Sequence, residues 1–238
     1  MIIASAVLGI EPTAFTKTFT IGIQLGAILA VVVIYRKRFL HSFRFYRILM
    51  VSMLPALAFG FALSKWIDNA LERVDLVGYG LLLGGVVLLY ADRWFKPEGK
   101  DGVQVGTRNG FIIGCFQCLA ILLPGTSRSA STIIGGLVCG LSRKQAAEYS
   151  FLLAVPTMCA ATGYRLLGHF LDGHTISAEE GATLLAGNAI AFVVALLAIR
   201  GFLRWLEQTG FRVFGIYRII VGLLILMLYY SGTEMTML

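Results

Sequence analysis

Charged residues are scarce in this chain. Only 14% of its 238 residues are Asp, Glu, Lys or Arg, while 58% are hydrophobic and the mean hydropathy is +0.81. Soluble domains carry about 25% charged residues, so this composition excludes an ordinary soluble protein and predicts an integral membrane protein. The net charge of +7 comes from basic residues in short loops between apolar segments. That distribution indicates membrane orientation and not nucleic-acid binding.

Cysteine and histidine are also rare, at four and three residues. Cys115 and Cys118 have the spacing of a redox or zinc motif, but they lie inside an apolar segment without a second pair, so we expect them to pack in the core. We predict no disulfides, no low-complexity tract and no cleavable signal peptide, since the apolar start at residues 1–9 lacks a basic residue. The expectation is one membrane domain, residues 1–238, helical throughout.

Apolar segments recur along the whole sequence. Six are long enough to cross a bilayer, and these are 19–35, 48–64, 76–91, 149–168, 183–199 and 213–230. Two more, 109–124 and 129–141, are each about half that length. Because a short polar turn joins these two, residues 109–141 are predicted to form a re-entrant helical hairpin that does not cross.

The loop charges alternate along the chain. Loops 36–47, 92–108, 141–148 and 200–218 contain most of the Lys and Arg, whereas the loop with Asp68, Glu72 and Asp75 and the loop 169–182 are acidic. The positive-inside rule places the basic loops in the cytoplasm, so the hairpin enters and leaves on that side. An anionic-lipid site is the alternative role for the basic run 36–47. Gly84-Gly85 is predicted to allow close helix packing.

The orientation of the spans indicates an inverted-topology repeat. The three spans after the hairpin run opposite to the three before it, which predicts a first pseudo-repeat at 1–95, a cytoplasmic linker at 96–108 and a second pseudo-repeat at 109–238. The first pseudo-repeat lacks a hairpin, because only about eighteen residues precede position 19. Such repeats place a site at the membrane midplane between the halves.

The turn of the hairpin reads Pro124-Gly125-Thr126-Ser127-Arg128-Ser129. A charged side chain at membrane depth is costly enough that a functional site is the default interpretation. Arg128 offers a planar fork to two phosphate oxygens, and the helix expected to begin near Ser127 adds amide donors. Gly125 permits close approach of the backbone to a ligand. The hydroxyls that could bond the phosphate, one of them as a nucleophile, are Thr126, Ser127, Ser129 and Thr132.

Other roles for these residues stay open. Arg128 could instead pair with carbonyls or an acid elsewhere in the protein. Gln117 and Gln24 could be interhelical hydrogen-bonders or part of the site. No general base is evident, because none of the thirteen acids falls at hairpin depth and the three histidines, His41, His169 and His174, fall in predicted loops.

Several motifs resemble one known family. Gly114-x-x-Gln117, the turn 124–129 with Thr132, and the segment 151–156 (Phe-Leu-Leu-Ala-Val-Pro) are similar to motifs of the bacitracin-resistance-type undecaprenyl-diphosphate phosphatases. The segment 23–32 resembles the first-half motif of that family. The resemblance covers nearly the whole chain, and it implies hydrolysis of undecaprenyl diphosphate to the monophosphate carrier of cell-wall synthesis, in the bacterial cytoplasmic membrane, with bacitracin resistance.

The sequence also departs from that family. Members begin with a glutamate-rich hairpin that ends in Ser-Ser-Thr-Gly-His, and neither is present here; Met1-Ile2-Ile3 resembles the residues that follow it. We therefore expect either a gene start placed at an internal methionine or a truncated chain. Ala130 stands where glycine is usual and Thr20 where an acid is common. The resemblance implies a divalent cation, Mg²⁺ or Ca²⁺, but no metal ligands are evident in this chain.

The resulting hypothesis is a lipid-diphosphate phosphatase. Arg128, Ser127 and Thr132 are the expected catalytic residues, and Gly125, Thr126, Ser129 and Gln117 the expected substrate-binding residues. The expected partners are a polyprenyl diphosphate and membrane lipids, with a homodimer left open. Alternatives are a transporter or flippase for lipid-linked phosphates, which needs no catalytic carboxylate, and an inactive paralogue that binds lipid diphosphate.

Overall fold

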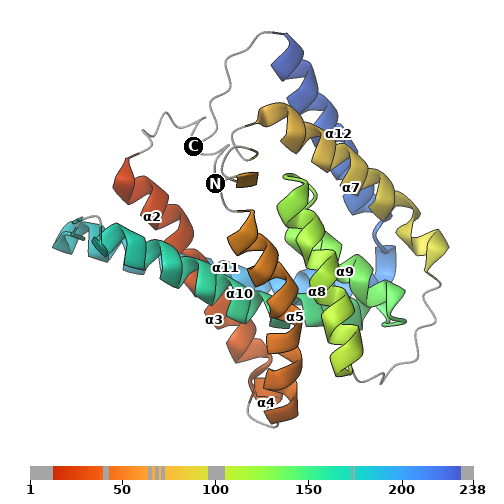
Figure 1. The fold of residues 1–238 in the computed structure, drawn as a ribbon, viewed down its shortest axis with the longest axis horizontal. Helices are drawn as coiled ribbons and strands as arrows, with labels where there is room; N and C mark the ends of the chain where they lie inside the picture. The colour runs from red at the N-terminus through yellow and green to blue at the C-terminus, as the bar shows by residue number, and fades with distance from the viewer. Residues whose placement is uncertain are drawn as a thin grey trace. The chain divides into compact units, whose positions relative to one another are not determined.

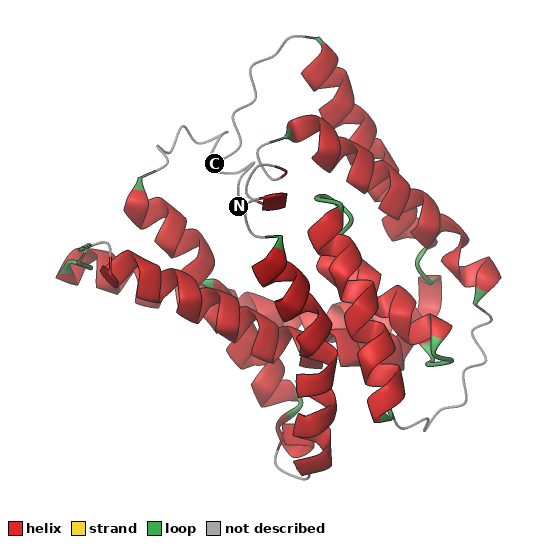
Figure 2. Ribbon diagram, in the orientation of Figure 1, coloured by secondary structure: helices red, strands yellow, loops and turns green. Residues whose placement is uncertain are grey.

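The computed structural model describes residues 13–39, 43–63, 66–67, 70, 73–95, 105–171, 173 and 175–231. Within these ranges every regular element is a helix (Figure 2), as the sequence predicted. In chain order the helices are α2 (Ala14–Gly22), α3 (Gln24–Ile34), α4 (Arg36–Phe39), α5 (Phe43–Ala62), α7 (Val74–Trp94), α8 (Thr107–Leu122), α9 (Arg128–Val138), α10 (Arg143–Leu171), α11 (Ala178–Thr209) and α12 (Arg212–Tyr230). Residues 1–9, His41, His174 and most of the predicted linker 96–108 lie outside the described residues.

Five of these helices are long and apolar enough to cross a membrane, namely α5, α7, α10, α11 and α12. These helices are compatible with a polytopic membrane protein. The first predicted span, 19–35, is formed by α2 and α3, which meet at Ile23 and together give an apolar helical stretch over Thr18–Ile34. The amide of Gly26 bonds Asn188 Oδ1 at 2.7 Å, and an inserted side chain of this kind interrupts the bond ladder of a helix.

Several helices extend further than their apolar cores. The helix α10 begins at Arg143 and ends at Leu171, so the prediction that His169 lies in a loop was wrong. Arg218 was assigned both to the basic loop 200–218 and to the span 213–230, and the structure agrees with the span, since Arg218 lies two turns inside α12. Helices continue past the apolar stretch because polar residues at their ends still complete the backbone hydrogen bonds that a membrane environment demands.

The residues group into two compact units. Unit 1 comprises residues 1–42, 154–201 and 238, and unit 2 comprises residues 43–153 and 202–237. In unit 1, Gly187 of α11 lies against Phe19 and Ile23, and Thr18 Oγ1 lies 3.1 Å from His169 Nδ1. The predicted hairpin belongs entirely to unit 2.

Unit 2 is built on two closely packed helix pairs, α5 with α8 and α7 with α12 (Figure 1). Gly110 and Gly114 of α8 lie so near Ser52 of α5 that a Cβ at either position would overlap it. On α7, a Cβ at Gly85 would lie 2.9 Å from the carbonyl oxygen of Gly215. Small residues allow this approach, as predicted for Gly84-Gly85.

A half-buried aspartate joins the ends of three helices in unit 2 through an ion pair and a hydrogen bond. Asp92 near the end of α7 pairs with Arg143 at the start of α10, with 2.8 Å between Oδ1 and Nη2. Its other oxygen accepts the amide of Phe211, just before α12, at 2.8 Å. Asp92 thus fixes the end of α7 to the starts of α10 and α12.

Candidate functional site: the turn between α8 and α9

The turn between α8 and α9 is closed by the hydrogen bond from the Thr126 amide to the Leu123 carbonyl, at 3.1 Å. Pro124 occupies its second position and Gly125 its third, with a φ of +91° at Gly125. This is the residue pattern of a type II turn, in which glycine tolerates the positive φ. Proline and glycine in this order therefore end α8 and reverse the chain.

Ser127 is the next residue, and it begins α9 as the N-cap. Its φ is +68°, and among the described residues no other non-glycine residue has a positive φ. Its Oγ accepts the Ala130 amide at 3.4 Å. Strained backbone of this kind costs about 1–3 kcal/mol and tends to occur at functional sites. The predicted helix start near Ser127 is confirmed.

The hydroxyls of the motif lie in different environments. Ser127 is exposed and Ser129 half-buried, whereas Thr126 and Thr132 are buried. Thr126 Oγ1 donates to the Leu123 carbonyl at 2.8 Å and so caps the end of α8. Arg128, half-buried, is the first residue of α9.

Thr132 is 1% exposed and lies one turn into α9. Its Oγ1 is 3.1 Å from both the Arg128 and the Ser129 carbonyl oxygens and 2.7 Å from Ser150 Oγ of α10. The structure thus brings Thr132 against the backbone of the first turn of α9 and not to the surface of the turn.

Gln117 of α8 is 3% exposed and lies on the helix face that also buries Ile113, Gly114 and Cys118. Its Oε1 has no hydrogen-bond partner within the described part of the chain. A buried acceptor without a partner costs free energy, so the position calls for a donor that a bound group or water would supply. Gln24 belongs to unit 1, where its Nε2 donates to the Thr20 carbonyl at 3.4 Å.

The turn is held from one side by α7. A Cβ at Gly80 would overlap the Pro124 carbonyl oxygen, and a Cβ at Gly125 would overlap the Val77 carbonyl oxygen. The backbones of α7 and the turn are therefore in direct contact, which requires glycine on both surfaces.

Arg218 of α12 holds the turn as well, and the sequence analysis missed it. It is 8% exposed, and its Nη2 donates to the Gly125 carbonyl at 2.6 Å. The guanidinium lies over Gly84, where a Cβ would come 2.6 Å from Nη2. The sequence feature that could have identified Arg218 is its position as a single arginine inside an apolar span, between Tyr217 and Ile219.

A hollow of about 550 Å³ lies at the end of α7 and the start of α12, lined by Leu89, Tyr90, Asp92, Arg93 and Arg212. No residue of the turn 123–129 is among these lining residues.

No metal centre is evident at the turn. Among the residues that the structure describes, no group of three or more His, Cys, Asp or Glu side chains is close enough together to hold a metal ion. His169 lies in unit 1 and contacts Thr18. The described side chains therefore do not fit the Mg²⁺ or Ca²⁺ that the resemblance implies.

The fold and the turn together define a helical membrane protein in which an arginine- and hydroxyl-rich turn joins α8 to α9. The chain belongs to the family described as bacitracin resistance protein BacA, whose model matches residues 1–224.

Three relatives illustrate the similarity, and each is named undecaprenyl-diphosphatase. The protein from Flavobacterium johnsoniae is 46% identical over 240 residues, which cover 100% of this chain and 90% of that protein. The protein from Bdellovibrio bacteriovorus is 45% identical over 240 residues, with the same coverage of both chains. The protein from Aquifex aeolicus is 42% identical over 226 residues, covering 94% of this chain and 87% of that protein. The family resemblance predicted from the motifs is confirmed.

Proposed function

We propose that this chain hydrolyses undecaprenyl diphosphate to undecaprenyl phosphate in the lipid-carrier cycle of cell-wall synthesis. Membership of the BacA family and the shared name of the relatives support this activity. A transporter of lipid-linked phosphates is not favoured, because these relatives are all named as diphosphatases. Bacitracin resistance follows from the same activity, since it restores the lipid phosphate carrier.

The observation that carries the proposal at this site is the strained start of α9. The first amides of a helix have no partner within the helix, and the helix dipole makes this end attractive to anions. Arg128 adds a guanidinium at the same helix end. A terminal phosphate at the turn would thus meet backbone donors and a bidentate cation together.

The reaction breaks the bond between the bridging oxygen and the terminal phosphorus. Water adds to that phosphorus and releases a proton, undecaprenyl phosphate leaves with the bridging oxygen, and the attacked phosphoryl group becomes inorganic phosphate. Charge spreads over the terminal phosphate oxygens in the transition state, so donors aimed at them lower the barrier. In our proposal Arg128 neutralises that charge, and Gly125, Thr126 and Ser129 shape the turn that receives the phosphate.

Ser127 and Thr132 differ in how they could act. Ser127 is exposed, so its hydroxyl can reach a phosphate or orient the attacking water. Thr132 is buried and already bonds two carbonyls, so we assign it a supporting contact with the first turn of α9. Gln117 Oε1 would accept a hydrogen bond from a group bound near the hairpin.

We further propose six membrane crossings, with α2 and α3 forming a broken first span, and α8 and α9 forming the re-entrant hairpin of an inverted repeat. The distribution of basic loops supports an orientation with the hairpin ends in the cytoplasm of a bacterial cytoplasmic membrane. The substrate would be taken from the outer face, where the carrier is recycled. The steps above are assigned to the side chains and amides of the hairpin.

The test is release of inorganic phosphate from undecaprenyl diphosphate and farnesyl diphosphate by the purified full chain. Arg128→Ala should reduce the rate by about a hundredfold or more, because it removes the cation from the transition state. Arg128→Lys is the matched variant, which keeps the charge without the fork and should recover only part of the rate. Equal rates for wild type and Arg128→Ala would overturn the phosphate clamp.

A further inference from the structure

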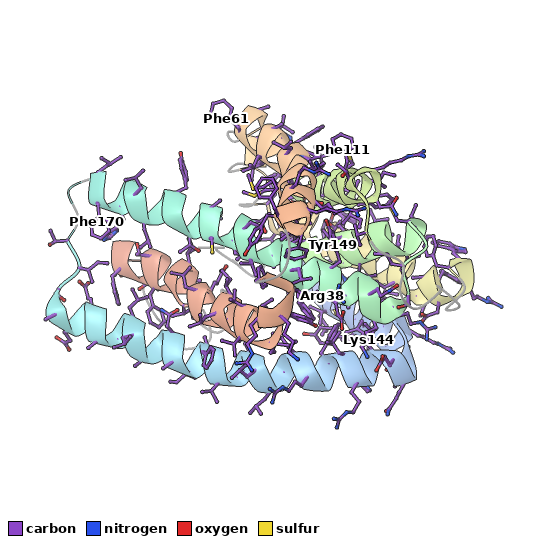
Figure 3. The ribbon with its side chains drawn as sticks, turned by 90° about the horizontal axis from the view of Figure 1, so that it is seen from below. Arg38, Phe61, Phe111, Lys144, Tyr149 and Phe170 are labelled. Carbon is purple, nitrogen blue, oxygen red and sulfur yellow. The ribbon has the colours of Figure 1, made fainter. Side chains whose placement is uncertain are left out.

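Two neighbouring residues of α10 contact two different helices of unit 2 through their hydroxyls. Tyr149 Oη lies 2.5 Å from Ser52 Oγ of α5, and Ser150 Oγ lies 2.7 Å from Thr132 Oγ1 of α9. Figure 3 labels Tyr149 among the side chains. All four side chains are buried. A buried hydroxyl without a hydrogen-bond partner destabilises the folded protein, so each pair fixes α10 to the helix it contacts.

Ser150 completes the bonding of Thr132. A hydroxyl has one proton to donate and can accept as well. The arrangement that satisfies both groups has Thr132 donating to the carbonyls of Arg128 and Ser129, each at 3.1 Å, while it accepts the proton of Ser150. A chain of contacts therefore runs from α10 to the backbone of Arg128.

That backbone needs support from outside the hairpin. The residue before Arg128 is Ser127, whose φ of +68° is strained, and its capping bond to the Ala130 amide is long at 3.4 Å. Strained conformations persist only when surrounding contacts hold them. The described contacts from α10 to the first turn of α9 include the hydrogen bond of Ser150 to Thr132.

We propose that Ser150 is a positioning residue for the hydrolysis. It acts through Thr132 to hold the first turn of α9, and so it sets where the Arg128 guanidinium meets the diphosphate. This inference rests on the proposed function for its effect on turnover. Ser150 itself is 1% exposed, so in this proposal it acts through Thr132 and not by direct contact with the substrate.

Tyr149 supplies a matched control for this idea. Tyr149→Phe removes a buried hydroxyl pair of the same kind, one residue away, but this pair joins α10 to α5 and not to α9. A Cβ at Gly110, near the start of α8, would come 3.2 Å from Tyr149 Oη, whereas the turn follows the other end of α8. Both variants should lose stability, but only loss of the Ser150 hydroxyl should disturb Arg128.

The kinetic test compares phosphate release by the full chain and its variants in detergent. Ser150→Ala should lower kcat about tenfold with KM within about twofold, because a small displacement of a positioned group costs rate more than binding. Tyr149→Phe should keep the wild-type kcat. Ser150→Ala in a Thr132→Val background should cause no further loss, since the two residues act in series. Unchanged kcat in Ser150→Ala, or losses that multiply in the double variant, would overturn the proposal.

Hydrogen exchange separates this proposal from the proposed function. Amides at the start of α9, including that of Ser131, which bonds the Ser127 carbonyl at 3.0 Å, should exchange faster in Ser150→Ala than in Tyr149→Phe. This readout needs no turnover. If these amides exchange faster in Ser150→Ala than in Tyr149→Phe but the wild-type chain releases no phosphate, only the proposed hydrolysis is refuted. If the amides are equally protected in the two variants, the role of Ser150 is refuted.

Discussion

Arg218 Nη2 donates a hydrogen bond of 2.6 Å to the Gly125 carbonyl oxygen. This contact joins α12 to the turn between α8 and α9, across a surface of α7 that has glycine at position 84. The guanidinium is buried within an apolar helix, where an unpaired cation would be strongly destabilising. The turn that carries Arg128 is thus held in place by a second arginine.

Arg218→Met tests this contact, because methionine keeps the apolar stem and removes the donor. We expect phosphate release to fall about a hundredfold, since the turn loses a charge-assisted hydrogen bond worth about 1.5–3 kcal/mol and its geometry relaxes. Arg212→Gln, on the same helix but exposed, is the control and should leave the rate close to that of wild type. A wild-type rate in Arg218→Met would show that the contact does not serve the turn.

Gly80→Ala tests the backbone contact between α7 and the turn. The added Cβ would overlap the Pro124 carbonyl oxygen, so either the helix or the turn has to move. Overpacking typically costs about 1–3 kcal/mol, so the variant should melt at a lower temperature and release phosphate more slowly. Gly60→Ala in α5 is the control, because no atom lies within 4 Å of a Cβ there. Similar melting temperatures and rates for the two variants would contradict the contact.

The sequence predicted the hairpin better than the contacts that hold it. The start of α9 at the Ser127 N-cap could be predicted, because the local sequence Pro124-Gly125 ends a helix and serine caps the next one. Arg218 was missed, because the contact from α12 to Gly125 joins positions 93 residues apart and leaves no local pattern. Because Arg218 lies at the end of a basic loop, it was interpreted as one more positive charge that sets the membrane orientation.

The break between α2 and α3 was hidden for a similar reason. Residues 19–35 are mostly apolar, and hydropathy alone cannot distinguish one helix from two. The break depends on Asn188 of α11, which bonds the Gly26 amide from 162 positions away. Thr132 shows the same limit at the site, since its burial against Ser150 is a tertiary contact that its place in the motif did not reveal.

The strain at Ser127 leads to opposite expectations for two small substitutions. Ser127→Gly removes the hydroxyl but tolerates a φ of +68°, so the free energy of unfolding should stay close to wild type. Ser127→Ala removes the cap and keeps the strain, which should cost about 1 kcal/mol. If the hydroxyl takes part in the reaction, phosphate release should fall in both variants regardless of stability. Full activity in Ser127→Gly would limit Ser127 to a structural role.

Asp92→Ala should destabilise the protein far more than a similar change at an exposed ion pair. Asp92 forms an ion pair with Arg143 and accepts a hydrogen bond from the Phe211 amide, each at 2.8 Å, and its loss leaves a half-buried guanidinium and an amide without these contacts. The expected cost of about 2–3 kcal/mol corresponds to a melting temperature lowered by about 5–10 °C for a chain of this size.

Glu207→Gln provides the comparison for Asp92. Its ion pair with Lys144 is 3.0 Å long, but both side chains are nearly half exposed. Exposed pairs contribute about 0.2–1 kcal/mol, so its melting temperature should change by less than about 3 °C. Because α7 and α12 both contact the turn, Asp92→Ala should also slow phosphate release at temperatures where the protein remains folded. Equal melting temperatures for the two variants would mean that the Asp92 network does not fix the ends of these helices.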